Sequence, residues 1–269
     1  KNVRQRLREF RQNADAEIWL YPCGMAAIAA VWRALRQRDP SNPSVQFGFP
    51  YVDTLKIQQR FAPADVRFFP VGGSDDLNQL TDLLSRQKIA AVLCESTTNP
   101  LLKSLDLQAL RQLADQHGFV LVIDDTLAAC INHDVLPYAD VVVTSLTKYF
   151  SGYGDVLAGS VTLNPASQHA DWLRTALADN FEELLADVDV EVLEKNSRDV
   201  RRRVEIINHS ANELAKWLND QPQVESVYHP GLDSQRFEWM NQNSTNHNGG
   251  LLSIVLKNPA VTTPVVFDH

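Results

Sequence analysis

The sequence has little cysteine, glycine or proline and no long hydrophobic run. Its three cysteines, Cys23, Cys94 and Cys130, have neither the number nor the spacing of a disulfide framework or a metal site. The 11 glycines and 13 prolines exclude collagen-like and low-complexity chains. The longest apolar run, Met25 to Trp32, is too short to cross a bilayer. These absences predict a cytoplasmic protein with free thiols and no membrane-spanning segment.

Basic residues are outnumbered by acidic residues, 25 to 33, which gives a formal net charge of −8. Such a chain is a poor candidate for binding nucleic acid or an anionic membrane. The seven histidines have no metal-ligand spacing, so no metal site is predicted. Hydrophobic residues make up 44% of the chain, which is ample for a core. The length suits one large domain plus part of a second.

Short apolar runs alternate with amphipathic stretches through the middle of the chain, as in a parallel sheet covered by helices. Three continuously apolar runs predict buried strands, at Ile89–Cys94, Phe119–Ile123 and Val141–Val143. A helix is predicted between the first two, with Ser104 as its N-cap and Gly118 just past its end. Each strand ends in a polar segment. Because ligands of open α/β sheets bind at the carboxyl ends of parallel strands, these segments are expected to face one site.

An anion site is predicted near the beginning of the chain. Glu17–Tyr21 reads as a strand, and Cys23-Gly24-Met25 opens a helix of good helix formers over 26–36. A glycine in the first turn of such a helix leaves N–H groups where an anion can bind.

The last third of the chain changes character. The stretch from Asp189 to Leu218 is strongly helical, and its Arg201-Arg202-Arg203 run, interleaved with acids, is interpreted as a solvated helix face rather than a basic patch. Strand-like pieces follow at Val224–Tyr228 and Leu251–Leu256. We therefore predict a large domain over residues 1–215 and the start of a smaller α/β domain over residues 216–269.

The polar segments together meet the chemical demands of pyridoxal phosphate. Ser145, Thr147 and the backbone at Gly24 would form a phosphate cup at such a site. Lys148 can form a Schiff base with an aldehyde, and Asp124 can keep a pyridine nitrogen protonated. Taken singly, such an Asp is more often a turn residue and such a Lys a surface group. Their joint order along the chain is the specific signal.

Five motifs along the chain together point to one enzyme family. They are Cys23-Gly24-Met25-Ala26-Ala27, Glu95-Ser96-Thr97-Thr98-Asn99-Pro100, Val122-Ile123-Asp124-Asp125-Thr126, Ser145-Leu146-Thr147-Lys148-Tyr149 and Asp155-Val156-Leu157-Ala158-Gly159. These motifs resemble the Cys/Met metabolism (transsulfuration) branch of fold-type I pyridoxal phosphate enzymes. Within this branch, the sequence is most similar to cystathionine gamma-synthases through residues 47–54 and 193–199. The resemblance implies a mostly parallel sheet flanked by helices, followed by a partial C-terminal α/β domain.

The resemblance implies a role for each matching position. Lys148 would bind the cofactor covalently and shuttle protons, and Tyr51 would stack on the ring and assist proton transfer. Asn99 would lie near the substrate carboxylate. Asp125 stands where Asn is common and would add negative charge near the ring. The cofactor-binding set implied is Gly24, Met25, Tyr51, Asp124, Thr126, Ser145, Thr147 and Lys148.

The expected reaction is a γ-replacement, in which the thiolate of cysteine displaces the acyl group of an O-acylhomoserine to give cystathionine. A cystathionine β- or γ-lyase and an O-acylhomoserine sulfhydrylase are the alternatives within the family. A non-catalytic fragment or dimerisation module is the alternative of another class. The resemblance further implies amino-acid substrates and a homodimer or homotetramer with the site at a subunit interface. It also places the family's substrate-carboxylate arginine beyond the end of this chain, which is expected to be a fragment.

Overall fold

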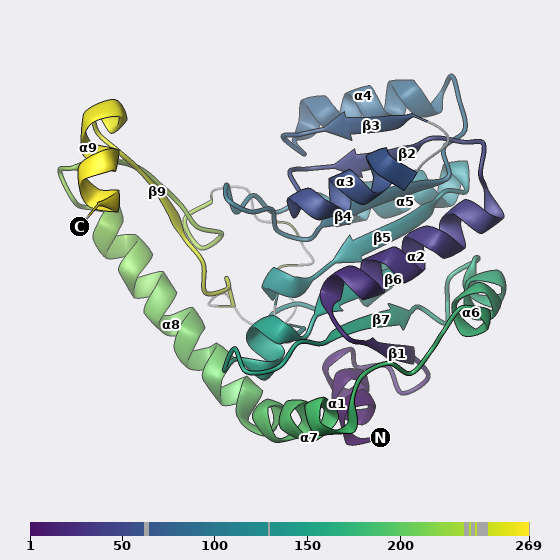
Figure 1. The fold of residues 1–269 in the computed structure, drawn as a ribbon. Coiled ribbons are helices and arrows are strands. Elements are labelled where there is room, and N and C mark those ends of the chain that lie inside the picture. Colours follow the sequence, from purple (N-terminus) through teal and green to yellow (C-terminus); the bar gives the residue numbers. More distant parts are fainter. Residues whose placement is uncertain (62–64, 129, 234–236, 238–239, 241–246, 269) are drawn as a thin grey trace.

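A seven-stranded sheet forms the centre of the structure, a computed structural model that describes residues 1–61, 65–128, 130–233, 237, 240 and 247–268. The strand order is β1-β7-β6-β5-β4-β2-β3 (Figure 1). The five strands β2 to β6 are parallel, and β7 runs antiparallel to both of its neighbours. The strands are β1 (Glu17–Tyr21), β2 (Ser44–Phe47), β3 (Val66–Phe69), β4 (Ala91–Glu95), β5 (Val120–Asp124), β6 (Val141–Ser145) and β7 (Gly159–Leu163).

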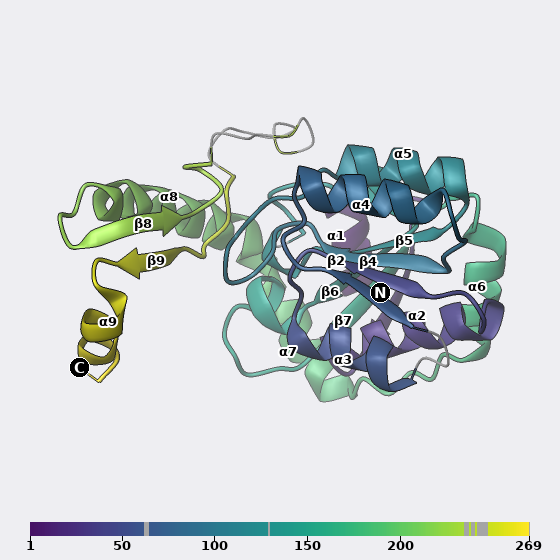
Figure 2. The ribbon, with the colours of Figure 1, turned by 90° about the horizontal axis from the view of Figure 1, so that it is seen from above.

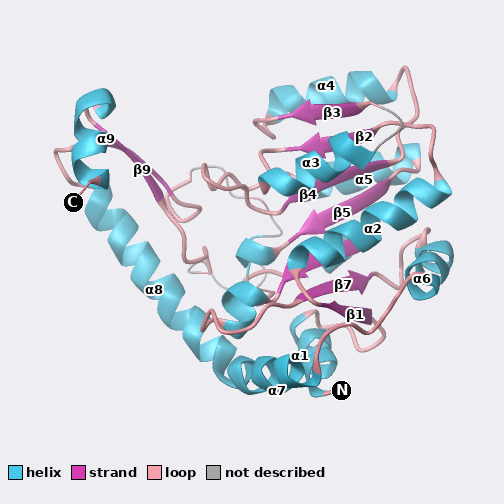
Figure 3. Cartoon of the chain, in the orientation of Figure 1, coloured by secondary structure: helices cyan, strands magenta, loops and turns pink. Residues whose placement is uncertain are grey.

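Helices cover both faces of the sheet (Figures 2 and 3). Because side chains alternate along a strand, Val92 and Leu121 pack toward one layer while Leu93 and Val122 pack toward the other. This explains why the three predicted strands read as continuous apolar runs. The first layer contains α4 (Ser74–Leu84) and α5 (Leu107–His117), and the second contains α2 (Gly24–Arg38), α3 (Val52–Phe61) and α6 (Ala170–Asp179).

Helix α5 ends where the sequence predicts but begins elsewhere. Gly118 ends it in the left-handed conformation, with φ of 72°. Its N-cap is Asp106 and not Ser104, since the Asp106 carboxylate accepts a hydrogen bond from the Ala109 N–H at 2.9 Å. The Ser104 hydroxyl lies instead 3.5 Å from that of Thr97, in a short bridge that pairs these two residues.

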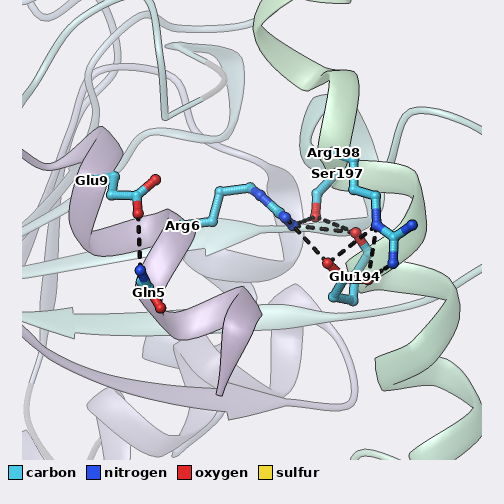
Figure 4. Close-up of polar contacts among 6 residues, drawn as sticks. All are labelled: Gln5, Arg6, Glu9, Glu194, Ser197 and Arg198. Carbon is cyan, nitrogen blue, oxygen red and sulfur yellow. Dashed lines mark hydrogen bonds and ion pairs between the residues drawn. The ribbon is translucent and has the colours of Figure 1, made fainter.

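At the bottom of Figure 1, α1 (Asn2–Phe10) packs beside α7 (Asp187–Asn196), although the two helices lie far apart in the sequence. Arg6 extends from α1 to this region, as Figure 4 shows. Its guanidinium donates to the Ser197 hydroxyl at 2.5 Å and to the Glu194 carboxylate at 3.2 Å. Glu194 also binds Arg198, at 2.7 Å. These contacts attach α1 to the segment that leads into the long helix α8 (Val200–Asn219).

A second, two-stranded sheet lies along the far end of the long helix α8 (Val200–Asn219). Strands β8 (Val224–Tyr228) and β9 (Ser253–Leu256) are antiparallel, and α9 (Pro259–Phe267) follows them. The predicted boundary at residues 215 and 216 falls inside α8 and stays a prediction. Within the described ranges, no helix has both the length and the apolar character needed to cross a membrane.

Candidate functional site

A cavity of about 1070 Å³ lies at the carboxyl ends of β4, β5 and β6. Its walls include the N-terminus of α2 and the first turn of α3. All nine residues that the sequence predicts for a site line this cavity, although they are spread over 125 positions of the chain: Gly24, Met25, Tyr51, Asn99, Asp124, Thr126, Ser145, Thr147 and Lys148.

The N-terminus of α2 approaches the end of β6 very closely. A Cβ placed on Gly24 would lie 2.9 Å from the Cβ of Ser145, which is closer than real side chains come. A Cβ on Gly159 would lie 2.3 Å from the Cys23 carbonyl oxygen. The Cys23 thiol is the N-cap of the helix and accepts a hydrogen bond from the Ala26 N–H at 3.4 Å. Two glycines therefore permit a cradle of backbone and hydroxyl groups at a helix N-terminus.

Thr126 ties together the ends of the two central strands. Its hydroxyl donates to the Asp124 carboxylate at 2.6 Å and accepts a hydrogen bond from the Ser145 N–H at 2.9 Å. The Thr126 N–H also donates to Asp124, at 2.9 Å. Burial raises the pKa of Asp124, although these hydrogen bonds oppose the shift. A partly buried carboxylate with a raised pKa is well placed to bind a cationic group inside the cavity.

Lys148 lies in the turn Thr147–Ser151, directly after β6. Its side chain is exposed at the cavity, and its backbone angles of φ −78° and ψ −116° lie outside the helical region. The Thr147 hydroxyl accepts from the Ala158 N–H at 3.0 Å and lies 3.2 Å from the Ala158 carbonyl oxygen. Thr147 thus joins the lysine turn to the segment that precedes β7.

The mouth of the cavity is aromatic and exposed. Tyr51 is 53% exposed and Phe49 is 43% exposed, although both line the cavity. Asn99 is exposed in the loop that follows β4.

The sequence matches the family described as Cys/Met metabolism PLP-dependent enzyme over residues 1–269. The chain belongs to this family. It is 38% identical over 265 residues to a cystathionine gamma-synthase of Neurospora crassa, covering 96% of this chain and 42% of that protein. It is 41% identical over 209 residues to the alanine racemase ungC of Aspergillus violaceofuscus, covering 75% of this chain and 35% of that protein. The chain therefore spans less than half the length of these curated relatives.

A solved structure shows the same fold. The cystathionine gamma-synthase of Xanthomonas oryzae pv. oryzae, solved in complex with cystathionine, superposes with a TM-score of 0.77 at 24% identity. The superposition covers 93% of this chain and 63% of that one. Together with the mostly parallel sheet between two helical layers, it confirms the predicted fold-type I architecture of this family member.

Glu95, the last residue of β4, also lines the cavity but is not among the site residues predicted from the sequence. Glu95 is paired across the sheet with Asp124, and its carboxylate accepts a hydrogen bond from the Tyr51 N–H at 2.5 Å. It therefore holds the backbone of the residue at the cavity mouth. Burial and the charge of Asp124 raise the pKa of Glu95. The sequence does contain an indication of its role, because Glu95 and Asp124 both end continuously apolar strands, where an acid is unusual.

We predict that stability falls with rising pH because of these two acids. Their pKa values are raised in the folded state, so the native chain binds more protons than the unfolded chain. The free energy of unfolding should then fall as the pH rises from the ordinary carboxylate range toward neutrality. Glu95→Gln keeps an acceptor for the Tyr51 N–H and should flatten this fall.

Denaturant unfolding of the ligand-free chain between about pH 5 and pH 8 measures the effect. Glu191→Gln, which replaces an exposed acid on α7, is the control and should leave the slope unchanged. Equal slopes for the unsubstituted chain and Glu95→Gln would contradict the prediction.

The Arg201-Arg202-Arg203 run is only partly the solvated face that the sequence predicts. Arg202 is exposed, and the Arg201 guanidinium lies 4.6 Å from the centre of the Phe10 ring. Arg203 instead lines the cavity and donates to backbone carbonyl groups of the lysine turn. The prediction is wrong for Arg203, because two of its acceptors, the Tyr149 and Phe150 carbonyl groups, lie more than 50 residues away along the chain.

Proposed function

We propose that this chain forms the cofactor-binding part of a pyridoxal phosphate enzyme that makes cystathionine from cysteine and an O-acylhomoserine by γ-replacement. The observation that carries the proposal is the meeting of Lys148, Asp124 and the Gly24 cradle in one cavity. The similarity to cystathionine gamma-synthases over 96% of the chain supports this choice of reaction.

The residues of the cavity fit pyridoxal phosphate. The cradle that a Cβ on Gly24 would fill suits a phosphate, held by backbone N–H groups of Gly24 and Met25 and by the hydroxyls of Ser145 and Thr147. Asp124 would hold the proton of the ring nitrogen, and Tyr51 would stack on the ring. Thr126 would lie beside the ring, with Asn99 near its hydroxyl group, and Lys148 would bind the aldehyde carbon.

When bound, the cofactor supplies a ring that withdraws electrons from a carbon atom of the amino-acid substrate. The Lys148 amine would remove the α-proton of that substrate and return protons later in the reaction. The Asp124 carboxylate would stabilise a positive charge on the ring nitrogen. The walls of the cavity are mostly apolar and include Ile28, Val143 and Leu157.

We propose that the active protein is a homodimer or homotetramer in the cytoplasm, with the site at a subunit interface. Exposed apolar side chains around the cavity mouth, on Phe49, Tyr51, Val52 and Leu157, support such an interface. We also keep the proposed division into a large domain over residues 1–215 and a small domain that begins at residue 216.

A lyase or sulfhydrylase activity is the alternative. The 41% identity to a protein named alanine racemase shows that similar chains are assigned to different reactions.

A product assay separates these functions. The protein is incubated with pyridoxal phosphate, an O-acylhomoserine, and cysteine and sulfide in competition, and the products are identified by mass spectrometry. Cystathionine as the main product supports the proposal, whereas homocysteine or an oxo acid would replace it with a sulfhydrylase or a lyase. A chain that takes up no cofactor would favour a non-catalytic module.

Gly159→Ala is predicted to weaken pyridoxal phosphate binding by at least about tenfold. The new Cβ would lie 2.3 Å from the Cys23 carbonyl oxygen, so the start of α2 must move away from β7 and open the cradle. A spectroscopic titration measures the dissociation constant. Gly118→Ala is the control, because it strains a left-handed glycine with nothing within 4 Å of the new Cβ and lies outside the residues that line the cavity. It should lower stability and leave the affinity unchanged, and an equal loss of affinity in both variants would contradict the prediction.

A further inference from the structure

Two backbone hydrogen bonds close the turn that carries Lys148, and the Phe150 side chain of this turn is buried. The Gly152 N–H donates to the Lys148 carbonyl at 2.7 Å, and the Ser151 N–H donates to the Leu146 carbonyl at 2.9 Å. The carbonyl groups of Tyr149 and Phe150, which follow the lysine, face the beginning of α8. The partners of these two carbonyl groups therefore contribute to the orientation of the turn.

Arg203 of α8 binds both of them. Its guanidinium donates to the Tyr149 carbonyl at 3.1 Å and to the Phe150 carbonyl at 3.2 Å. It also donates to the Asn196 carbonyl at 2.8 Å and to the Asp199 carboxylate at 2.8 Å. All three guanidinium nitrogens are used, and the side chain is only 17% exposed. A planar group with donors in a fixed fork can join these acceptors at one geometry, which a lysine ammonium cannot do.

The turn is shaped around this guanidinium. Gly152 has φ of 84°, and a Cβ placed on it would lie 1.9 Å from an Arg203 nitrogen. Asn196 adds a second connection, because its side-chain amide donates to the Ser151 hydroxyl at 3.1 Å and to the Asp155 carboxylate at 2.8 Å. The lysine turn is thus attached to the junction of α7 and α8 on both sides of Gly152.

We propose that Arg203 is a positioning residue for Lys148, which it directs into the cavity by holding the carbonyl groups of the next two residues. The inference rests on the proposed function, in which Lys148 bonds to the cofactor aldehyde. Without the guanidinium, water would bind the two carbonyl groups and the turn would sample more conformations, so the lysine amine would meet the aldehyde less often. Most of the proposed phosphate contacts come from the α2 cradle and Ser145, and the Thr147 hydroxyl is held by the Ala158 backbone rather than by Arg203. Loss of Arg203 should therefore affect the covalent bond more than the retention of the cofactor.

The test compares Arg203→Met, Arg203→Lys and the control Arg202→Met in the full chain. Each protein is mixed with pyridoxal phosphate. The total bound cofactor is measured by equilibrium dialysis, and the rate of covalent attachment is measured by rapid borohydride trapping with mass analysis of the Lys148 peptide. In Arg203→Met, the rate of attachment should fall about tenfold while the bound cofactor changes less than about twofold. Arg203→Lys should restore little of the rate, and Arg202→Met, which removes an exposed arginine from the same turn of α8, should match the unsubstituted chain.

The inference about Arg203 would be wrong, without affecting the proposed function, if the rate were unchanged in Arg203→Met or fell equally in Arg202→Met. A parallel fall of attachment and retention would also overturn it, because that is the signature of general loss of structure. If Arg203→Met fails to fold, Arg203→Lys keeps the charge and part of the contacts and decides the same question. Absence of trapping at Lys148 in the unsubstituted chain would overturn the proposed function itself, and that outcome is distinct from the others.

Discussion

Lys148→Ala is expected to abolish cystathionine formation from cysteine and an O-acylhomoserine, with a loss of at least about 1,000-fold in turnover. The substitution removes both the amine that would bind the cofactor aldehyde and the base that would take the α-proton. Lys148 follows β6 and is exposed at the cavity, so truncation to alanine should leave the fold intact.

The measurement is the initial rate of cystathionine formation at saturating cofactor, together with the circular dichroism spectrum of each protein. Lys195→Ala is the matched control, since it removes an exposed lysine on α7 and should retain the activity of the unsubstituted chain. Normal turnover by Lys148→Ala would rule out the proposed mechanism.

Arg11→Met is expected to cost about 3–5 kcal/mol of unfolding free energy. Arg11 forms an ion pair with Asp125 at 2.5 Å, and both side chains have no exposed surface. Its guanidinium also donates to the Thr144 hydroxyl at 3.2 Å, and this hydroxyl donates to Asp125. Removal of the cation leaves a buried carboxylate without its partner, which is far more costly than the loss of a surface pair.

The double variant Arg11→Met with Asp125→Asn removes both charges and should recover most of the lost stability. Denaturant unfolding of the single and double variants measures this, with Lys56→Met as the control because its ion pair with Asp53 is exposed and should matter little. A double variant as unstable as Arg11→Met would show that lost packing, and not the unpaired charge, is responsible.

The same ion pair changes the interpretation of Asp125. From the sequence, this residue is expected to add negative charge near the cofactor ring. In the structure Asp124 lines the cavity, whereas the carboxylate of Asp125 is fully buried against Arg11. Its charge is therefore balanced inside the protein. The partner lies 114 positions earlier in the chain, and nothing in the local pattern indicates it.

Contacts between residues close in sequence were the most predictable part of the fold. The buried strands appear as apolar runs because both faces of the sheet are covered, and Gly118 ends its helix because it accepts a left-handed conformation. The prediction of Ser104 as the N-cap of α5 is wrong, because Ser104 and Asp106 are both residue types that commonly cap helices. Pairing of Ser104 with Thr97 across a loop decided in favour of Asp106.

Local apolar runs and motifs are enough to predict the family, the fold class and the set of polar residues at the strand ends. The side chains that support that set could not be predicted from these patterns, because they come from distant parts of the chain. Glu95 holds Tyr51, Arg203 holds the turn of Lys148, and Arg11 neutralises Asp125. Each of these contacts joins segments at least 44 residues apart, and a charged side chain shows no periodicity that reveals its partner. Folding brings these distant partners within hydrogen-bond distance of one another.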